Sequence, residues 1–273
     1  MGRVALLLAV VIFPLHGLCV SWALAQDTRP LRVFLRAGPK THGPAGNGLH
    51  DHQVWLHEWQ PLLTSRGAVV QGGLQFPTEA QLDTADVLVM FAANAGTIVG
   101  DQRAALEKFL RRGGGIVVLH DALVAAEDPL WFKTIVGGAW ENKVARFFEG
   151  ENTHYYVNSE HPITNGASNF NITDEVYWNL HMMPTAHVLG VAMQPVPPGQ
   201  PAPEIGRLIP QVWVYENQLP GGEPYRAFVS LHGHHYSTFS SRHVRGLILR
   251  GIAWAGKRDA DSLASRDEVL GLQ

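Results

Sequence analysis

Residues 86–91 read DVLVMF, and this short run of apolar residues behind a single aspartate decides the fold. A nearly continuous aliphatic stretch of this length is typical of a strand buried on both faces, as in a parallel sheet. Residues 116–119, IVVL, form a second such run, and residues 31–35, LRVFL, a third. Apolar residues recur at helical spacing between these runs. The pattern predicts an α/β protein with a doubly wound, mostly parallel sheet.

The second half of the chain has strands richer in aromatic and polar residues, and some of them are expected to be antiparallel additions. These strands are predicted at 155–157, 187–191, 212–215 and 227–231. A helix is predicted from about Ser241 to Ala255. The five prolines of 195–203 predict a surface loop. We expect the folded domain to cover 30–257 and residues 258–273 to be a loosely ordered tail.

The first 25 residues have the features of a secretory signal peptide. Arg3 supplies a positive start, residues 4–13 an apolar core, and Ala23-Leu24-Ala25 a cleavage site. The apolar run stops at Pro14, which makes it too short to cross a bilayer. The single cysteine, Cys19, lies inside this segment. We therefore expect an exported protein, periplasmic or extracellular, that has no membrane partner after cleavage and no thiol chemistry.

Charge and missing motifs exclude several classes of function. The formal net charge is −3, and no basic cluster is longer than Arg111-Arg112, which argues against nucleic acid as a partner. The sequence has no G-x-S-x-G, Walker A, H-E-x-x-H or C-x-x-C motif. The expected partner is a small molecule or another protein, and a homo-oligomer is left open.

The histidines gather after predicted strands, and ligands of open α/β sheets bind outside the carboxyl ends of the strands. The loops after Leu35, Phe91 and Leu119 are therefore where a site is expected. In the first of them we propose three metal ligands: His42, His50 and His52. The alternative is that Asp51 caps a helix beginning near His52.

Two further histidine positions are candidates for catalysis. His120 directly follows the strand 116–119 and is predicted to be a general acid/base or a ligand, the alternative being a buried structural histidine. His234 follows the strand 227–231 and is predicted to be catalytic, with its neighbours His232 and His235 contacting the substrate.

Glu175 is the predicted general base. It lies in TDEVYW at residues 173–178, where adjacent carboxylates on a strand face opposite sides, so that one can point inward. Trp140 and Trp178 are predicted to form a wall on which a sugar ring stacks. Eight tryptophans would also suit a large aromatic core.

Several stretches resemble the trehalose-utilisation (ThuA-like) family, whose fold is similar to that of class I glutamine amidotransferases. They are HPITNG at 161–166, ITDEVYW at 172–178, QVW at 211–213, GH at 233–234 and RGIAWAG at 250–256. In order and spacing they cover the chain from about Leu31 to Lys257. Amidotransferases place a catalytic cysteine on the elbow after a strand. Here His120 stands at that elbow, so amidotransfer by that mechanism is excluded.

The resemblance implies a role in carbohydrate catabolism, on oxidised (3-keto) disaccharides or glycosides. Our first hypothesis is metal-assisted acid/base chemistry by a hydrolase, lyase or isomerase, with zinc, manganese or calcium and no organic cofactor. The alternative is a non-catalytic carbohydrate-binding or interaction protein. A third hypothesis is a metal-storage or pH-sensing surface, which would need exposed clusters without a pocket. The chain departs from the family pattern at Ala45–Leu49, which are extra residues, and at Ala139–Lys143.

Overall fold

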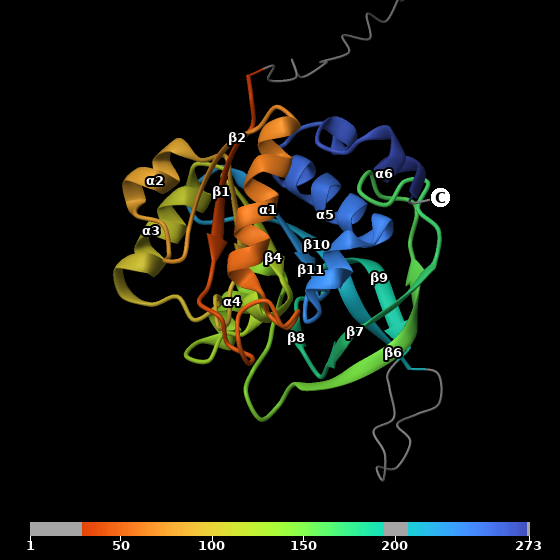
Figure 1. Cartoon of the computed structure of the whole chain (residues 1–273). Coiled ribbons are helices and arrows are strands. Elements are labelled where there is room, and N and C mark those ends of the chain that lie inside the picture. Colours follow the sequence, from red (N-terminus) through yellow and green to blue (C-terminus); the bar gives the residue numbers. More distant parts are fainter. Residues whose placement is uncertain (1–28, 194–206, 272–273) are drawn as a thin grey trace, which may run out of the picture.

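The structure is a computed structural model that describes residues 29–193 and 207–271 (Figure 1). The predicted signal peptide, including Cys19, and the proline-rich loop 195–203 lie outside the described residues. Within the described ranges, none of the helices has the length and apolar character needed to span a bilayer.

Strands and helices alternate through the first half of the chain and strands dominate the second. The first half comprises β1 (Arg32–Ala37), α1 (His52–Ser65), β2 (Val69–Gly73), α2 (Glu79–Thr84), β3 (Val87–Phe91), α3 (Gly100–Arg111), β4 (Gly115–Leu119), the 3-10 helix η1 (His120–Leu123) and α4 (Pro129–Val136). The second comprises β5 (Gly138–Ala139), β6 (Arg146–Val157), β7 (Phe170–Trp178), β8 (His181–Met182), β9 (His187–Met193), β10 (Leu208–Gln218), β11 (Pro224–Ser230), η2 (Tyr236–Ser240), α5 (Arg242–Ala255), η3 (Ala260–Ser262) and α6 (Arg266–Gly271).

One large sheet organises the molecule, in the order β2-β1-β3-β4-β11-β10-β9-β6-β7. The first five strands of that order are mutually parallel, and every pairing from β11 to β7 is antiparallel. A separate two-stranded sheet joins β5 and β8. The predicted fold class is confirmed: a doubly wound, mostly parallel sheet is extended by antiparallel strands from the second half of the chain.

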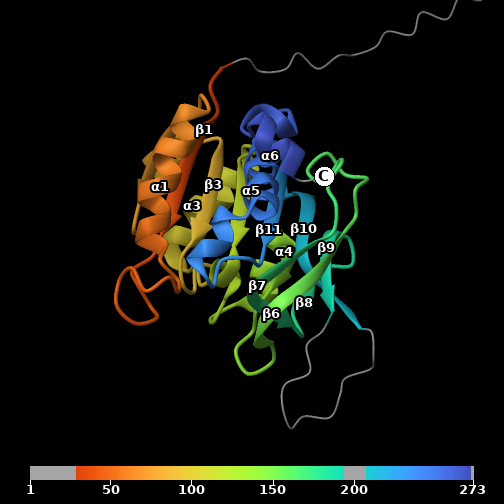
Figure 2. The same ribbon diagram turned by 45° about the vertical axis from the view of Figure 1, so that its right-hand side comes forward.

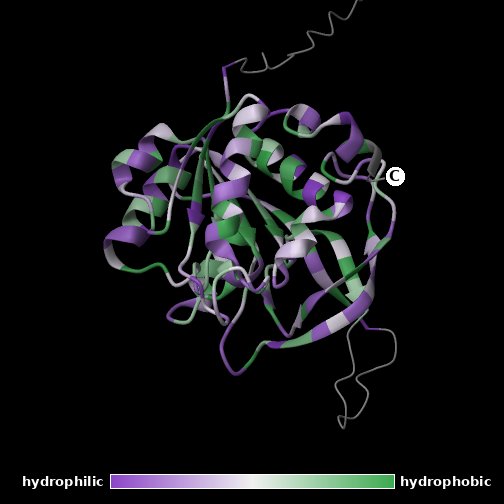
Figure 3. Ribbon diagram, viewed as in Figure 1, coloured by the Kyte–Doolittle hydropathy of each residue, from purple (hydrophilic) through white to green (hydrophobic). Residues whose placement is uncertain are grey.

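Alternate residues of each central strand feed two different cores. In β3, Val87, Val89 and Phe91 pack on the side of α1 and α5, whereas Leu88 and Met90 pack on the side of α2, α3 and α4. The two helical layers lie on opposite faces of the sheet (Figures 1 and 2). Apolar residues concentrate in the sheet and on the inward helix faces, with polar residues outside (Figure 3). This arrangement explains why the central strands read as unbroken apolar runs.

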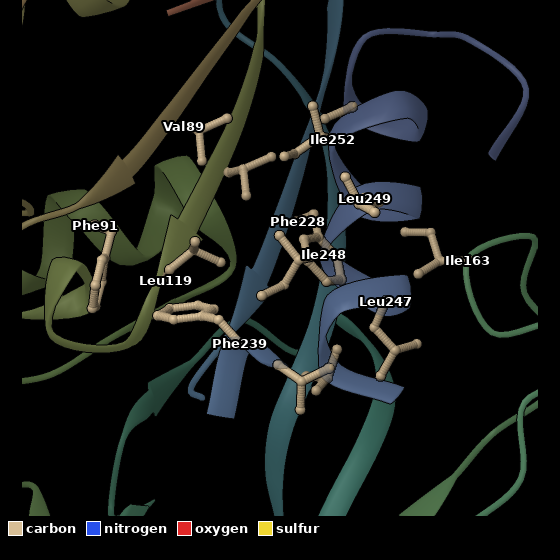
Figure 4. Packing of buried hydrophobic residues seen from close by; sticks show 14 of the residues in the cluster. Val89, Phe91, Leu119, Ile163, Phe228, Phe239, Leu247, Ile248, Leu249 and Ile252 are labelled. Atoms are coloured by element: carbon tan, nitrogen blue, oxygen red, sulfur yellow. The ribbon is translucent and has the colours of Figure 1, made fainter. Parts of the chain in front are cut away.

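Helix α5 packs directly on the middle of the sheet. Its residues Ile248 and Ile252 belong with Phe228 of β11 to the larger core cluster, and Ile248 lies beside Phe228 (Figure 4). Gly251 makes this approach feasible, because a Cβ at that position would lie inside the contact distance of the Phe228 ring. The helix predicted from about Ser241 to Ala255 is thus confirmed, with Ser241 as its N-cap residue.

The sequence predicts a loosely ordered tail over 258–273, but the described part of that segment is folded. Leu263 is buried, and the buried carboxylate of Glu268 pairs with Arg66, the C-cap residue of α1, and with Arg245 of α5. Asp261 accepts a hydrogen bond of 2.5 Å from Arg250. Composition alone pointed to a tail because these long-range ion pairs cannot be seen in the local sequence.

Two short helices escaped prediction although their end signals are present in the sequence. Helix α2 begins with a capping box between Thr78 and Gln81. Helix α4 has Asp128 as its N-cap, Pro129 at its first position and Gly137 in the left-handed conformation at its end.

Candidate functional site

Four polar side chains meet where loops leave the carboxyl ends of the parallel strands. His50 follows β1, His120 follows β4, His234 follows β11, and Glu175 comes from β7. Nε2 of His50 lies 3.0 Å from Nε2 of His120 and 2.9 Å from Nδ1 of His234. The Glu175 Oε2 atom lies 3.5 Å from His120 Nε2 and 3.4 Å from His234 Nδ1. All four residues are buried, and one donor atom from each lies within 4.8 Å of the others.

His120 occupies the sharp turn after β4. Its φ of 49° places it in the left-handed region, which is uncommon for a residue with a side chain and clusters at functional sites. Its Nδ1–H donates to the carbonyl of Leu231 over 2.9 Å, which leaves the Nε2 lone pair directed at the cluster. Burial lowers the pKa of His120 well below its usual value, even though Asp121 opposes the shift, so the imidazole is neutral.

His50 is oriented by a carboxylate. Its Nδ1–H points at Asp121 over 3.1 Å, so its Nε2 faces the cluster. Burial alone would raise the pKa of Asp121, but hydrogen bonds from His50 and His52 hold it well below its usual range. The ring nitrogens of His52 face Asp121 at 3.0 Å and the carbonyl of Pro39 at 3.1 Å. His52 therefore supports Asp121 and has no ring nitrogen left for the cluster.

Backbone contacts fix His234 against the first histidine loop. The amide of His50 donates to the carbonyl of His234 over 2.9 Å. The amides on either side of His234, those of Gly233 and His235, donate to the carboxylate of Asp174 at 2.7 and 3.2 Å. Burial raises the pKa of Asp174 to about 6 and lowers that of His234 to about 4.

Strand β7 presents Glu175 and Tyr177 on one face, because alternate residues of a strand point the same way. The Tyr177 hydroxyl lies 3.0 Å from Nε2 of His120. Burial raises the pKa of Glu175 to about 8, an effect opposed by a hydrogen bond from Tyr177. The side-chain amide of Gln211 on β10 holds this strand in place, because its oxygen accepts from the backbone N–H of Tyr177 and its NH₂ group donates to the Tyr177 carbonyl.

A pocket of about 300 Å³ opens in front of this cluster. This volume is at the small end of the range for ligand sites. The loops after β1, β3 and β4 and the start of β6 contribute to it. Its lining comprises Thr41, His42, His50, Ala93, Asn94, Asp121, Val124, Trp140, Asn142, Phe147, Glu175 and Tyr177.

The structure thus brings together most of the predicted catalytic and ligand positions. His50, His120, His234 and Glu175 form one group, which we call the histidine–glutamate cluster. His42 is exposed at the mouth of the pocket, with its ring centroid 4.1 Å from that of His50. Trp140 lines the pocket, as its predicted role in substrate binding requires.

Other predicted positions lie apart from the pocket. Trp178 is part of the hydrophobic core, and His232 is buried with its ring 4.7 Å from that of Tyr155. Burial lowers the pKa of His232 to about 3. His235 instead pairs with Glu149 over 2.6 Å on the outside of the cluster. Neighbouring residues of a strand point to opposite faces, so Trp178 points into the core because Tyr177 points to the pocket.

Asp51 does not cap α1 through its side chain, contrary to the alternative drawn from the sequence. Its carboxylate instead accepts the amides of Gly46 and Gly48 and pairs with Lys40 over 3.0 Å. The extra residues of this loop are therefore folded around Asp51, and they place His50 with a φ of 45°.

Sequence reasoning missed Asp121, Tyr177 and Phe147. Asp121 adjoins His120, and Tyr177 stands two residues from Glu175, so strand alternation could have placed Tyr177 on the same face. Phe147 is cross-strand partner to Tyr177, a pairing that only the register of β6 with β7 reveals.

The donors of the histidine–glutamate cluster fit a divalent metal. Neutral imidazole nitrogens and a carboxylate are the usual ligands of zinc and manganese. With metal–nitrogen distances of about 2.1 Å, neighbouring ligand atoms lie roughly 3.0 to 3.4 Å apart, which matches the spacing seen here. Carbonyl or carboxylate partners behind His120 and His50 are the outer contacts that metal-bound histidines commonly make. Two smaller groups, His50–His52–Asp121 and Glu149–His234–His235, also bring potential ligands together.

Fold and site define a class: a doubly wound α/β domain with a histidine- and carboxylate-lined pocket at the carboxyl edge of its sheet. The chain belongs to the ThuA family, described as trehalose utilisation, whose model matches residues 56–255. This membership supports a carbohydrate-related role. No curated protein matches the chain.

Two solved structures share the fold. A ThuA-like protein from Bacteroides uniformis is 17% identical with a TM-score of 0.61, the match covering 88% of this chain and 98% of that one. A ThuA-like protein from Parabacteroides merdae is 16% identical with a TM-score of 0.61, covering 84% of this chain and 90% of that one. At this identity the likeness concerns the fold alone.

Proposed function

We propose that this chain is an exported, metal-dependent enzyme of carbohydrate catabolism that acts on a carbonyl-bearing (keto) disaccharide or glycoside. One observation carries the proposal: three imidazole nitrogens and one carboxylate oxygen converge, and two of the four residues, His50 and Glu175, line a pocket. The proton-bearing nitrogens of His120 and His50 are both engaged elsewhere, so the Nε2 atoms that carry the lone pairs face the same place, 3.0 Å apart. Family membership supports the carbohydrate.

The metal would be held by the imidazoles of His50, His120 and His234, which leaves a coordination position for the ligand and leaves Glu175 beside them as the general base. Bound there, it would supply a Lewis acid that polarises a carbonyl or hydroxyl oxygen of the ligand. Tyr177 lines the same pocket, and while its hydroxyl proton is donated to Glu175, its oxygen can accept a hydrogen bond from a ligand hydroxyl. Glu175 also lines the pocket, so its carboxylate is placed to accept a proton from a ligand hydroxyl.

The test is the metal content of the purified protein, measured by mass spectrometry after reconstitution with zinc, manganese or calcium. We expect a stoichiometric metal in the wild type and its loss in the His120→Ala, His234→Ala double variant. His57→Ala, which removes an exposed histidine of α1, is the matched control and should retain the metal. Wild-type protein without metal after all three reconstitutions would refute metal dependence and favour a binding protein.

Asp121→Asn provides a second arm, because it removes the carboxylate that orients His50 while leaving the histidine–glutamate cluster intact. Loss of such an outer contact typically weakens metal affinity about 10- to 100-fold. Competition with a chelator measures this change, and Asp101→Asn, at an exposed position of α3, serves as the control. An unchanged affinity would show that Asp121 does not orient the ligand.

A further inference from the structure

The outer half of the pocket differs in chemistry from the histidine–glutamate cluster. Trp140 and Phe147 form an aromatic wall there, and Asn94 and Asn142 add amide groups. The ring centroids of Trp140 and Phe147 are 6.2 Å apart, and Trp140 lies 4.7 Å from Tyr177. One wall of the pocket is thus apolar, with the planes of the Trp140 and Phe147 rings inclined at 42° to each other and the asparagine amides among the other lining groups.

Trp140 is held rigidly in this wall. Its amide donates to Leu123 and its carbonyl accepts from Ala125, both over 3.3 Å, which ties it to the segment that follows His120. The indole Nε1–H donates to Asn142 over 3.1 Å. A preformed aromatic surface costs little conformational entropy when a ligand binds to it.

Phe147 is an apolar side chain exposed at the pocket. It is 58% exposed, although it stands directly opposite Tyr177 in the β6–β7 pairing. Cross-strand partners share a face of a sheet, so the Phe147 ring lies on the same face as the Tyr177 and Glu175 side chains. An exposed aromatic ring at a pocket offers area that a ligand can cover.

Fixed positive charge is missing from this pocket. None of the described residues that line it is lysine or arginine. Lys40, on the same loop as His42, is bound to Asp51 and Asn47. Arg146, the neighbour of Phe147, donates to three nearby carbonyls. A phosphate or carboxylate far from the histidine–glutamate cluster would therefore lack the cationic partner that such groups need.

We propose that the outer pocket is a subsite for one uncharged sugar ring, stacked on Trp140 and Phe147, and that it rejects phosphorylated sugars. This inference rests on the proposed function for the identity of the ligand as a carbohydrate. A volume of about 300 Å³ shared with the cluster leaves room for a single ring against the wall. The two asparagine amides offer donors and acceptors to hydroxyl groups.

The experiment measures the affinity of the protein for trehalose and, in parallel, for trehalose 6-phosphate by isothermal titration calorimetry. It is run on the reconstituted protein and again after treatment with a chelator. We expect trehalose to bind in both states and the phosphate ester to bind at least roughly tenfold more weakly, equivalent to about 1.4 kcal/mol. Binding of neither sugar, or equal or tighter binding of the ester, would overturn the subsite.

Substitutions of the two aromatic residues test where the sugar ring binds. Trp140→Ala and Phe147→Ala should each weaken trehalose binding roughly tenfold, whereas Tyr156→Ala, at an exposed aromatic position of the same strand as Phe147, should leave it unchanged. Phe147 is exposed, so its removal is compatible with folding. Wild-type affinity in both pocket variants would refute the stacking wall.

The two proposals fail separately. If the protein takes up no metal but still binds trehalose through Trp140 and Phe147, the metal-dependent chemistry falls and the ring subsite stands. A protein that holds stoichiometric metal but binds trehalose and its ester alike loses only the ring subsite.

Discussion

Asp86 shows how much one carboxylate at the start of a strand can organise. It precedes β3 and receives hydrogen bonds from the guanidinium groups of Arg29 and Arg32 at 2.6 and 2.8 Å, and from the backbone amide of Arg32 at 3.0 Å. Burial alone would raise the pKa of Asp86, but these donors hold it well below its usual range. The carboxylate thereby fastens the start of β1 to that of β3.

This pairing predicts a pH-dependent stability. A carboxyl with a folded pKa below its unfolded value of about 3.9 stabilises the fold above that pH, and the contribution is lost as the pH falls toward the folded pKa. We expect Asp86→Asn to lower the free energy of unfolding by about 1–2 kcal/mol at pH 7. The difference from the wild type should shrink below about pH 4.

Urea unfolding of both proteins between pH 3 and 7 measures this difference. Asp101→Asn, which changes an exposed carboxylate, controls for the general effect of removing a charge. A difference that stays constant across this range would contradict the role given to Asp86.

His50 and His120 have an uncommon backbone conformation. Both adopt positive φ values, 45° and 49°, although neither is glycine. Conformations of this kind persist where the surroundings over-determine them. Here the backbone bond to His234 constrains His50, and the Nδ1 bond to Leu231 constrains His120. The strain is located at the residues whose side chains converge.

The packing of helix α5 on the sheet depends on one close approach between a helix residue and a strand residue. Helix α5 packs on the sheet next to Phe228 (Figure 4), and a Cβ at Gly251 of the helix would meet the Phe228 ring. The Phe228 ring is fully buried among other core residues, so it cannot move away from the helix without displacing them. The short distance between helix α5 and the sheet therefore depends on the absence of a side chain at Gly251.

Gly251→Ala tests this fit. Alanine favours the helix by up to about 1 kcal/mol, but the added methyl group forces the helix and ring apart, at a typical cost of about 1–3 kcal/mol. We expect a net loss of stability in chemical denaturation. Phe228→Leu in the same chain should recover part of that loss, because the two effects are not additive for residues in contact. Two strictly additive losses would contradict direct contact.

At the scale of the whole molecule, the C-terminal segment closes the face of the sheet that α1 and α5 cover. Helix α6 packs on α5, and Glu268 pairs with Arg66, the C-cap residue of α1. The C-terminal segment thus joins α5 to the end of α1, two segments that are remote in sequence, and Figure 2 shows α6 beside α5 near its top.

Ending the chain after Lys257 should therefore destabilise the fold. The truncation exposes the surface covered by Leu263, worth about 1.5–3 kcal/mol on burial, and leaves Arg66 and Arg245 without the Glu268 carboxylate. We expect a lower thermal midpoint. Leu263→Ala in the full chain should show part of the effect. A truncated protein with the wild-type midpoint would return the segment to the loose tail that the sequence predicts.

Local sequence determined the framework of this protein. The buried runs such as 86–91 and 116–119 must be strands covered on both faces, because no other arrangement removes both sets of apolar side chains from water. The placement of polar residues at strand ends followed from the same framework, since parallel strands end at one edge. His120 and His234 could be predicted as candidate site residues on that basis, whereas Glu175 is predicted from the alternation of side chains along a strand.

Only the tertiary structure decided which of the predicted residues share a site. Register set Tyr177 and Phe147 on the pocket face and sent Trp178 to the core, because a shift of one residue reverses every side chain of a strand. Contacts across about seventy residues assigned His52 to Asp121 and left His50 free to join His120. Such partners are far apart in the chain, so their distances depend on how the elements pack, and local sequence carries no record of them.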